Sequence, residues 1–154
     1  MEVISSIDAG GLEDARGSLE RDGIEVAAST CDVGDDHALD RVVASAEAFL
    51  GRIDVLVCNA GINPHFGSLT TATDEEYDAI MRINLRSTVQ LCNRVIPGMA
   101  ARRDGSVILT SSISGLRGNG KIGVYALSKA AVAQLAERFR IHYDPGLVDK
   151  PDLL

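Results

Sequence analysis

Two hydrophobic patterns alternate along the chain. Short continuous apolar runs, typical of buried strands, cover residues 2–6, 24–31, 53–58 and 106–112. Between them, apolar residues recur every three or four positions, which predicts helices over residues 12–21, about 39–50, 77–99 and 123–143. Parallel strands buried on both faces read as continuous apolar runs. The alternation therefore predicts a parallel sheet with helices on both faces, in one domain.

Local signals mark several of the predicted boundaries. Gly10-Gly11 is expected to separate the first strand from the first helix, and Gly51 to end the second helix. Thr73 with Glu76 three positions later is a capping-box pattern, which places a helix start there. Pro97 is expected to bend the end of the helix that follows. A loop broken by glycines is expected over residues 115–120.

Size and charge narrow the possible functions. The 154 residues weigh 16.3 kDa, 45% of them are hydrophobic, and the net charge is -7 with a pI of about 4.9. An acidic chain is a poor partner for nucleic acid or for an anionic membrane surface. No apolar run approaches the ~20 residues that span a bilayer, and the first residues do not resemble a secretory signal. We expect a soluble cytoplasmic protein with no nucleic-acid or membrane partner.

Neither the cysteines nor the histidines show metal-ligand spacing. Each cysteine lies in an apolar run and none forms a C-x-x-C pair; they are Cys31, Cys58 and Cys92. Buried reduced thiols are the expected state. The histidines are His37, His65 and His142. We expect no metal site.

Polar residues follow three of the predicted strands. They are Asp32, Asn59 and Ser112. Right-handed crossovers place the carboxyl ends of parallel strands at one edge of the sheet, where open α/β folds bind ligands. Tyr125 and Lys129 are four residues apart and so share one side of a helix. Each feature has a plainer reading, because Asp32 could cap a turn and a helical Tyr and Lys are often a solvated pair.

Taken together, these residues resemble a known family. Asn59-Ala60-Gly61 after a strand, Asn84 in a helix, and Ser112 thirteen positions before Tyr125-x-x-x-Lys129 form a specific combination. On these motifs the chain, from about residue 3 to 143, resembles the short-chain dehydrogenase/reductase family. The resemblance implies a doubly wound parallel sheet in a Rossmann-like three-layer α/β/α fold.

The resemblance implies a role for each catalytic residue. Tyr125 would exchange a proton with the substrate oxygen, and Ser112 would hydrogen-bond and orient that oxygen. Lys129 would stabilise the phenolate and hold the nicotinamide ribose hydroxyls. Asn84 would distort its helix locally and hold a water that relays the proton to Lys129.

The resemblance also implies cofactor contacts. Asp32 and Val33 would contact the adenine ring. Asn59, Ala60 and Gly61 would let the cofactor approach the sheet edge closely, although Gly61 could also be a plain turn glycine. After the first strand, Asp8 follows Ser6 and Ile7, and no Arg is placed to hold a 2′-phosphate. The cofactor is therefore expected to be NAD or NADP, with a slight preference for NAD.

The chain departs from the family pattern at both ends. The family's first strand and its G-x-x-x-G-x-G turn are missing before residue 3, and Gly10-Gly11 lacks that spacing. The strand expected before Pro145-Gly146 is also missing, and Lys150 stands where a Thr would contact the nicotinamide. The sequence therefore predicts an incomplete fold, truncated at the N-terminus and shortened at the C-terminus.

Two functions of different class follow. The first is an NAD(P)-dependent oxidoreductase that interconverts an alcohol and a ketone and forms a homo-oligomer through the Asn84 and Tyr125 helices. The alternative is a degenerate, non-catalytic family member that acts as an oligomerisation module, since the helix over 125–139 is rich in alanine and apolar on most sides. A Rossmann-like methyltransferase is disfavoured, because it leaves Tyr125 and Lys129 unexplained.

Overall fold

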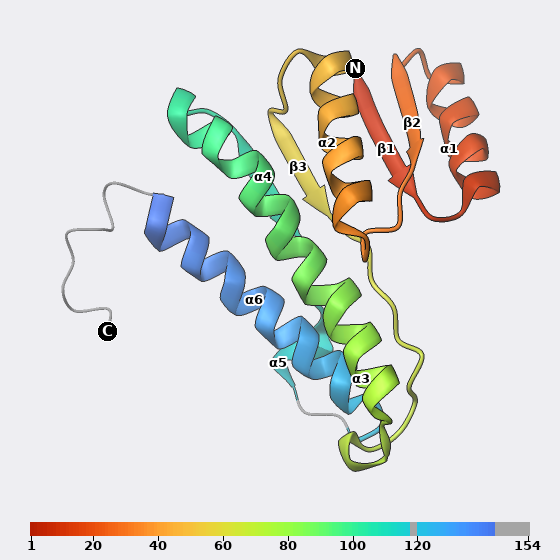
Figure 1. Cartoon of the computed structure of the whole chain (residues 1–154), viewed down its shortest axis with the longest axis vertical. Coiled ribbons are helices and arrows are strands. Elements are labelled where there is room, and N and C mark those ends of the chain that lie inside the picture. The colour runs from red at the N-terminus through yellow and green to blue at the C-terminus, as the bar shows by residue number, and fades with distance from the viewer. Residues whose placement is uncertain (118–119, 144–154) are drawn as a thin grey trace. The chain divides into compact units, whose positions relative to one another are not determined.

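The computed structural model describes residues 1–117 and 120–143, and it confirms the alternation of strands and helices (Figure 1). The chain divides into two compact units. The first unit is Met1–Leu56 with Gln90–Ile108, and the second is Val57–Val89 with Leu109–Leu154. The expectation of one NAD(P)-binding domain over residues 1–154 stays a prediction. Gly118, Asn119, Pro145-Gly146 and Lys150 lie outside the described residues.

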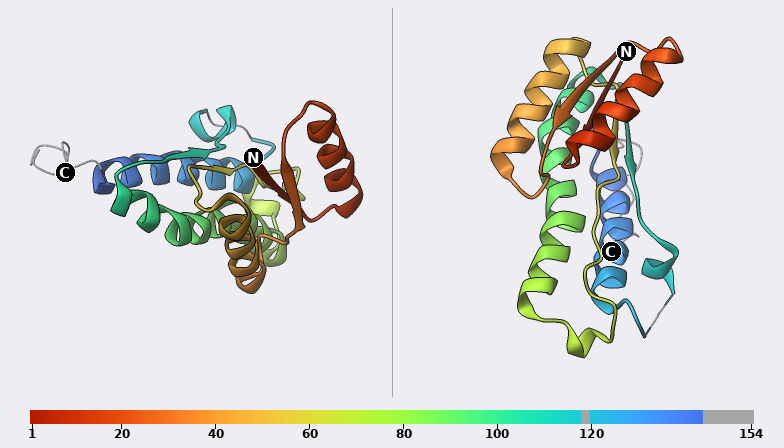
Figure 2. Two further views of the ribbon diagram at one scale, coloured as in Figure 1. Left: turned by 90° about the horizontal axis from the view of Figure 1, so that it is seen from above. Right: turned by 90° about the vertical axis from the view of Figure 1, so that its right-hand side faces the viewer.

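The first unit begins with a β-α-β-α segment. It comprises β1 (Glu2–Ser6), α1 (Ala9–Arg21), β2 (Val26–Thr30) and α2 (Asp36–Leu50). The two strands pair in parallel, in a register that sets Glu2 opposite Val26 and Ser6 opposite Thr30. Figure 2 shows this pair of strands lying between α1 and α2. Both faces of the pair are thus covered by helices, as the continuous apolar runs predict.

A second pair of strands is separate from the first. β3 (Val55–Cys58) pairs with β4 (Ser106–Leu109), and β1 is a hydrogen-bonded neighbour of neither. Backbone bonds run from Ser106 N to Asp54 O and from Thr110 N to Cys58 O, at 2.8 and 3.0 Å. Both strands advance in the same direction between these bonds, so they are parallel. The expected doubly wound α/β sheet is therefore present and incomplete.

Apolar side chains of the first unit join its elements. One buried cluster combines α2, the loop before β3 and α4 (Ser87–Arg102) through Ala46, Ile53, Val95 and Met99. Val3 of β1, Leu56 of β3 and Val107 of β4 pack against the same cluster. Residues from both strand pairs therefore share one core although β1 and β3 do not pair.

Helix capping in the first unit corrects one predicted boundary. The helix expected to follow Gly10-Gly11 begins earlier, at Ala9, because the Asp8 carboxylate accepts a bond from Gly10 N at 3.1 Å. An N-cap side chain of this kind outweighs the low helix propensity of glycine. Gly51 ends α2 with a φ of 78°, as predicted.

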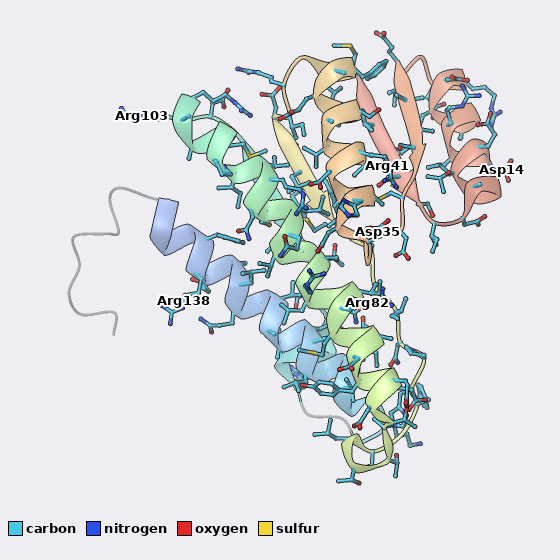
Figure 3. The ribbon with its side chains drawn as sticks, in the orientation of Figure 1. Asp14, Asp35, Arg41, Arg82, Arg103 and Arg138 are labelled. Atoms are coloured by element: carbon cyan, nitrogen blue, oxygen red, sulfur yellow. The ribbon has the colours of Figure 1, made fainter. Side chains whose placement is uncertain are left out.

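The start of α2 is capped in a similar way. The Asp35 carboxylate accepts from His37 N at 2.9 Å. The Arg41 guanidinium, six residues further along the chain, lies 3.9 Å from the same carboxylate (Figure 3). A carboxylate at the N-cap favours the start of a helix.

The second unit contains the remaining elements. They are η1 (Leu69–Thr71), α3 (Asp74–Met81), the π-helical segment η2 (Arg82–Arg86), α5 (Ile113–Leu116) and α6 (Gly123–Tyr143). The predicted capping box is confirmed, since Thr73 and Glu76 each accept from the other's backbone N–H. The predicted strand over 106–112 is too long, because β4 ends at Leu109 and Ser112 caps α5. The loop expected from residue 115 accordingly begins with helical residues.

Two features are absent from the described residues. None of their helices is long and apolar enough to cross a membrane. No group of three or more His, Cys, Asp or Glu among them is placed to hold a metal ion.

Candidate active site

Asn84 lies at the centre of the second unit. It is 1% exposed and sits within the π-helical segment, so the expected local distortion of its helix is confirmed. Its Oδ1 accepts from Ile62 N at 2.7 Å, and its Nδ2 donates to Ile62 O at 3.0 Å and to Ser128 Oγ at 3.0 Å. The side chain therefore connects three segments: the chain after β3, η2 and α6. The predicted water relay through Asn84 stays a prediction.

Lys129 and Gly61 lie beside Asn84. The ammonium of Lys129, on a residue only 4% exposed, donates to Thr110 O at 2.7 Å. A Cβ added to Gly61 would lie 3.4 Å from Asn84 Oδ1 and 3.4 Å from Lys129 Nζ. Gly61 therefore leaves open the space directly over both polar groups. The close approach of a cofactor to Asn59-Ala60-Gly61 stays a prediction, and Asn59 and Ala60 are exposed after β3.

Burial changes the pKa of Lys129. Removal from water disfavours the ammonium and lowers the pKa of Lys129 from its ordinary value. Because the folded-state pKa is lowered, burying the charged form opposes folding below that pKa, and the cost is relieved as the pH rises through it. An ammonium that gives up its proton more readily than an exposed lysine suits a group that relays protons.

Tyr125 lies one helical turn before Lys129. The Lys129 Nζ is 5.8 Å from the centroid of the Tyr125 ring. The Tyr125 carbonyl accepts from Ser128 Oγ at 2.7 Å, and this hydroxyl in turn accepts from Asn84. Ser128 is fully buried and was not singled out from the sequence. Its position between Tyr125 and Lys129 is the only sequence signal that could have identified Ser128 as part of the site.

Ser112 is positioned by the packing of α5 against α6. Its Oγ accepts from Ser114 N at 3.2 Å, which makes it the N-cap of α5. The neighbouring Ser111 Oγ donates to Lys129 O at 2.7 Å. A Cβ added to Gly115 would lie 2.6 Å from Ala130 N and 2.7 Å from the Lys129 carbonyl carbon. The absence of a side chain at residue 115 therefore lets the backbones of α5 and α6 touch beside Lys129.

The predicted adenine contacts lie in the other unit. Asp32 Oδ1 accepts from Gly34 N at 2.8 Å, so Asp32 caps a turn, as its plainer interpretation predicts. Val33 packs against the buried cluster that contains Cys31 and Leu39. The adenine contacts of Asp32 and Val33 stay predictions.

The second unit thus brings together an ammonium, a phenol one turn away, and a buried amide, with a hydroxyl at the start of the adjacent helix. Such a set can move a proton to or from an oxygen of a bound molecule and can hold hydroxyl groups through the ammonium.

Comparison with known proteins finds many similar chains. A family model described as short chain dehydrogenase matches residues 2–148. Dehydrogenase/reductase SDR family member 4 of Sus scrofa is 33% identical over 143 residues, which are 93% of this chain and 51% of that protein. The chain therefore spans about half the length of the curated relatives it matches.

Solved structures agree with this match. NAD⁺-bound xylitol dehydrogenase superposes with a TM-score of 0.88 at 25% identity, over 93% of this chain and 55% of that one. An actinorhodin polyketide ketoreductase variant with NADPH gives a TM-score of 0.88 at 25% identity, over 94% and 56%.

We expect Gly115→Ala to destabilise the fold. The added methyl group would meet backbone atoms of α6, which cannot turn away, so the free energy of unfolding should fall by about 1–3 kcal/mol. Gly17→Ala is the matched control, because Gly17 lies inside α1 and an added Cβ would lie in ordinary contact with Arg21 Nη1, at 3.7 Å. This substitution should raise the free energy of unfolding by about 0.5–1 kcal/mol. Urea unfolding measures both. Equal effects of the two substitutions would refute the close approach of α5 and α6.

Proposed function

The chain belongs to the short-chain dehydrogenase family, and we propose that it carries the catalytic half of an oxidoreductase that interconverts an alcohol and a ketone. The observation that carries this proposal is the position of Gly61, whose missing side chain leaves the space beside Asn84 and Lys129 open. A nicotinamide ring and its ribose would bind there.

The proposed roles follow the chemistry of each side chain. Tyr125 gives a proton to the carbonyl oxygen during reduction and takes it back during oxidation. Lys129 favours the phenolate through its positive charge and binds ribose hydroxyls through its N–H groups. Ser112 holds the substrate oxygen. Asn84 fixes α6 against the chain after β3 and so keeps Tyr125 and Lys129 in place.

The cofactor is proposed to be a nicotinamide dinucleotide, which supplies the hydride. Its support is the open space at Gly61, the ammonium of Lys129, and the NAD⁺ and NADPH in the two solved relatives. We prefer NAD slightly, because Asp8 follows β1 and no Arg does. The proposed contacts of Asp32, Val33, Asn59 and Ala60 complete this site.

The proposed cofactor site lacks the motif that would bind the pyrophosphate. The family's G-x-x-x-G-x-G pattern does not occur in the 154 residues. In the family this turn binds the pyrophosphate at the N-terminus of the helix that follows the first strand.

We also propose that the chain forms a homo-oligomer. Two copies would associate through α6 and the helix that contains Asn84. Leu127 supports this, because it is an apolar residue of α6 that is 45% exposed.

We expect the 154-residue chain to bind NADH and NADPH weakly or not at all. The reason is that the 154 residues do not contain the family's phosphate-binding turn. Isothermal titration calorimetry on the purified chain measures this directly. A dissociation constant in the micromolar range would overturn the expectation.

Turnover at millimolar cofactor tests the oxidoreductase itself. Tyr125→Phe should lower the turnover of a panel of alcohols and ketones by about 10²–10⁴-fold, because it removes the proton donor. Tyr77→Phe is the control, since Tyr77 is exposed on α3 and should leave turnover unchanged. A dimer in native mass spectrometry without any turnover would instead support the oligomerisation module.

A further inference from the structure

His65 is a buried titratable residue that the proposed reaction does not use. The residue is 8% exposed and lies in the segment between β3 and α3. Its Nδ1 is 2.9 Å from Glu76 Oε2. Its Nε2 is 3.1 Å from Ser68 O and 3.4 Å from Thr71 Oγ1. Both ring nitrogens therefore have close oxygen neighbours.

All of these oxygens can only accept a hydrogen from the ring. Glu76 Oε2 already accepts from Thr73 N at 3.0 Å, as a carboxylate does. Ser68 O is a carbonyl oxygen. The Thr71 hydroxyl donates to Ser68 O at 2.9 Å, which leaves only a lone pair of its oxygen for the ring.

A neutral imidazole has a single N–H and would leave one ring nitrogen facing an acceptor without a hydrogen between them. The imidazolium has two N–H groups and satisfies both sides. Its charge also pairs with the partly buried Glu76 carboxylate. The hydrogen-bond count therefore assigns the charged form to His65.

The segment that His65 fastens lies against the start of α6. Gly67 forms a parallel bridge with Ile122. A Cβ added to Gly123 would lie 2.8 Å from Leu69 N, so the two backbones touch. Ile122 O accepts the first helical bond of α6 from Ala126 N at 2.8 Å. These contacts fall two and three residues before Tyr125 in the sequence.

We propose that His65 is a positioning residue. Held as an imidazolium between Glu76 and Ser68 O, it locks residues 65–76 into the shape that supports the first turn of α6, and through that turn it positions Tyr125. Only the catalytic importance of Tyr125 rests on the proposed function. The charge state of His65 and its effect on α6 are independent of it.

The charge state is tested by ¹⁵N NMR of the histidine rings at neutral pH. We expect both nitrogens of His65 to show the shifts of an imidazolium, and the signals to be assigned by their loss in His65→Gln. His37 is the control, since it is exposed. A neutral tautomer of His65 at pH 7 would overturn the assignment.

The hold on α6 is tested by hydrogen exchange of the Ala126 amide. His65→Gln should speed this exchange by about tenfold or more, because a buried acceptor loses its donor. His37→Gln should not change it. Glu76→Gln keeps an uncharged acceptor and should give a smaller increase together with a neutral His65 ring, and it remains measurable if His65→Gln does not fold. Unchanged Ala126 exchange in a folded His65→Gln would refute the positioning role. None of these readouts uses turnover or cofactor, so they separate this inference from the proposed function.

Discussion

The candidate site depends on the buried amide of Asn84. Its oxygen and nitrogen bind the backbone of Ile62 on one side and Ser128 on the other. A buried polar group without partners costs about 1–3 kcal/mol, so this set of bonds strongly favours one arrangement of the three segments it joins. Asn84 also lies in a π-helical turn. Such turns often occur at functional sites.

Two glycines allow the rest of the site to assemble around that amide. At Gly61 a side chain would fill the space beside Asn84 and Lys129, and at Gly115 it would separate α5 from α6. Lys129 is thus buried, with backbone packed on one side and no side chain at residue 61 on the other. Its lowered pKa follows from this burial. Close backbone packing therefore produces both the geometry and the electrostatics of the site.

The sequence predicted what depends on local pattern. The capping box at Thr73 and the glycine stop at Gly51 are local signals, and both are observed. The four-residue helix α5 is too short to show a period, so it was missed. The pairing of His65 with Glu76 joins residues eleven positions apart across a loop, and no pattern in the sequence indicates such a fold. The π-helical turn at Asn84 was expected only from the family resemblance.

The most direct test of the Asn84 account is a double-mutant cycle with Asn84→Ala and Ser128→Ala, followed by urea unfolding. If Asn84 Nδ2 donates to Ser128 Oγ in solution, the two substitutions should be non-additive by about 0.5–1.5 kcal/mol. Losses in the free energy of unfolding that simply add would contradict the bond, and with it the claim that Asn84 holds α6 in place.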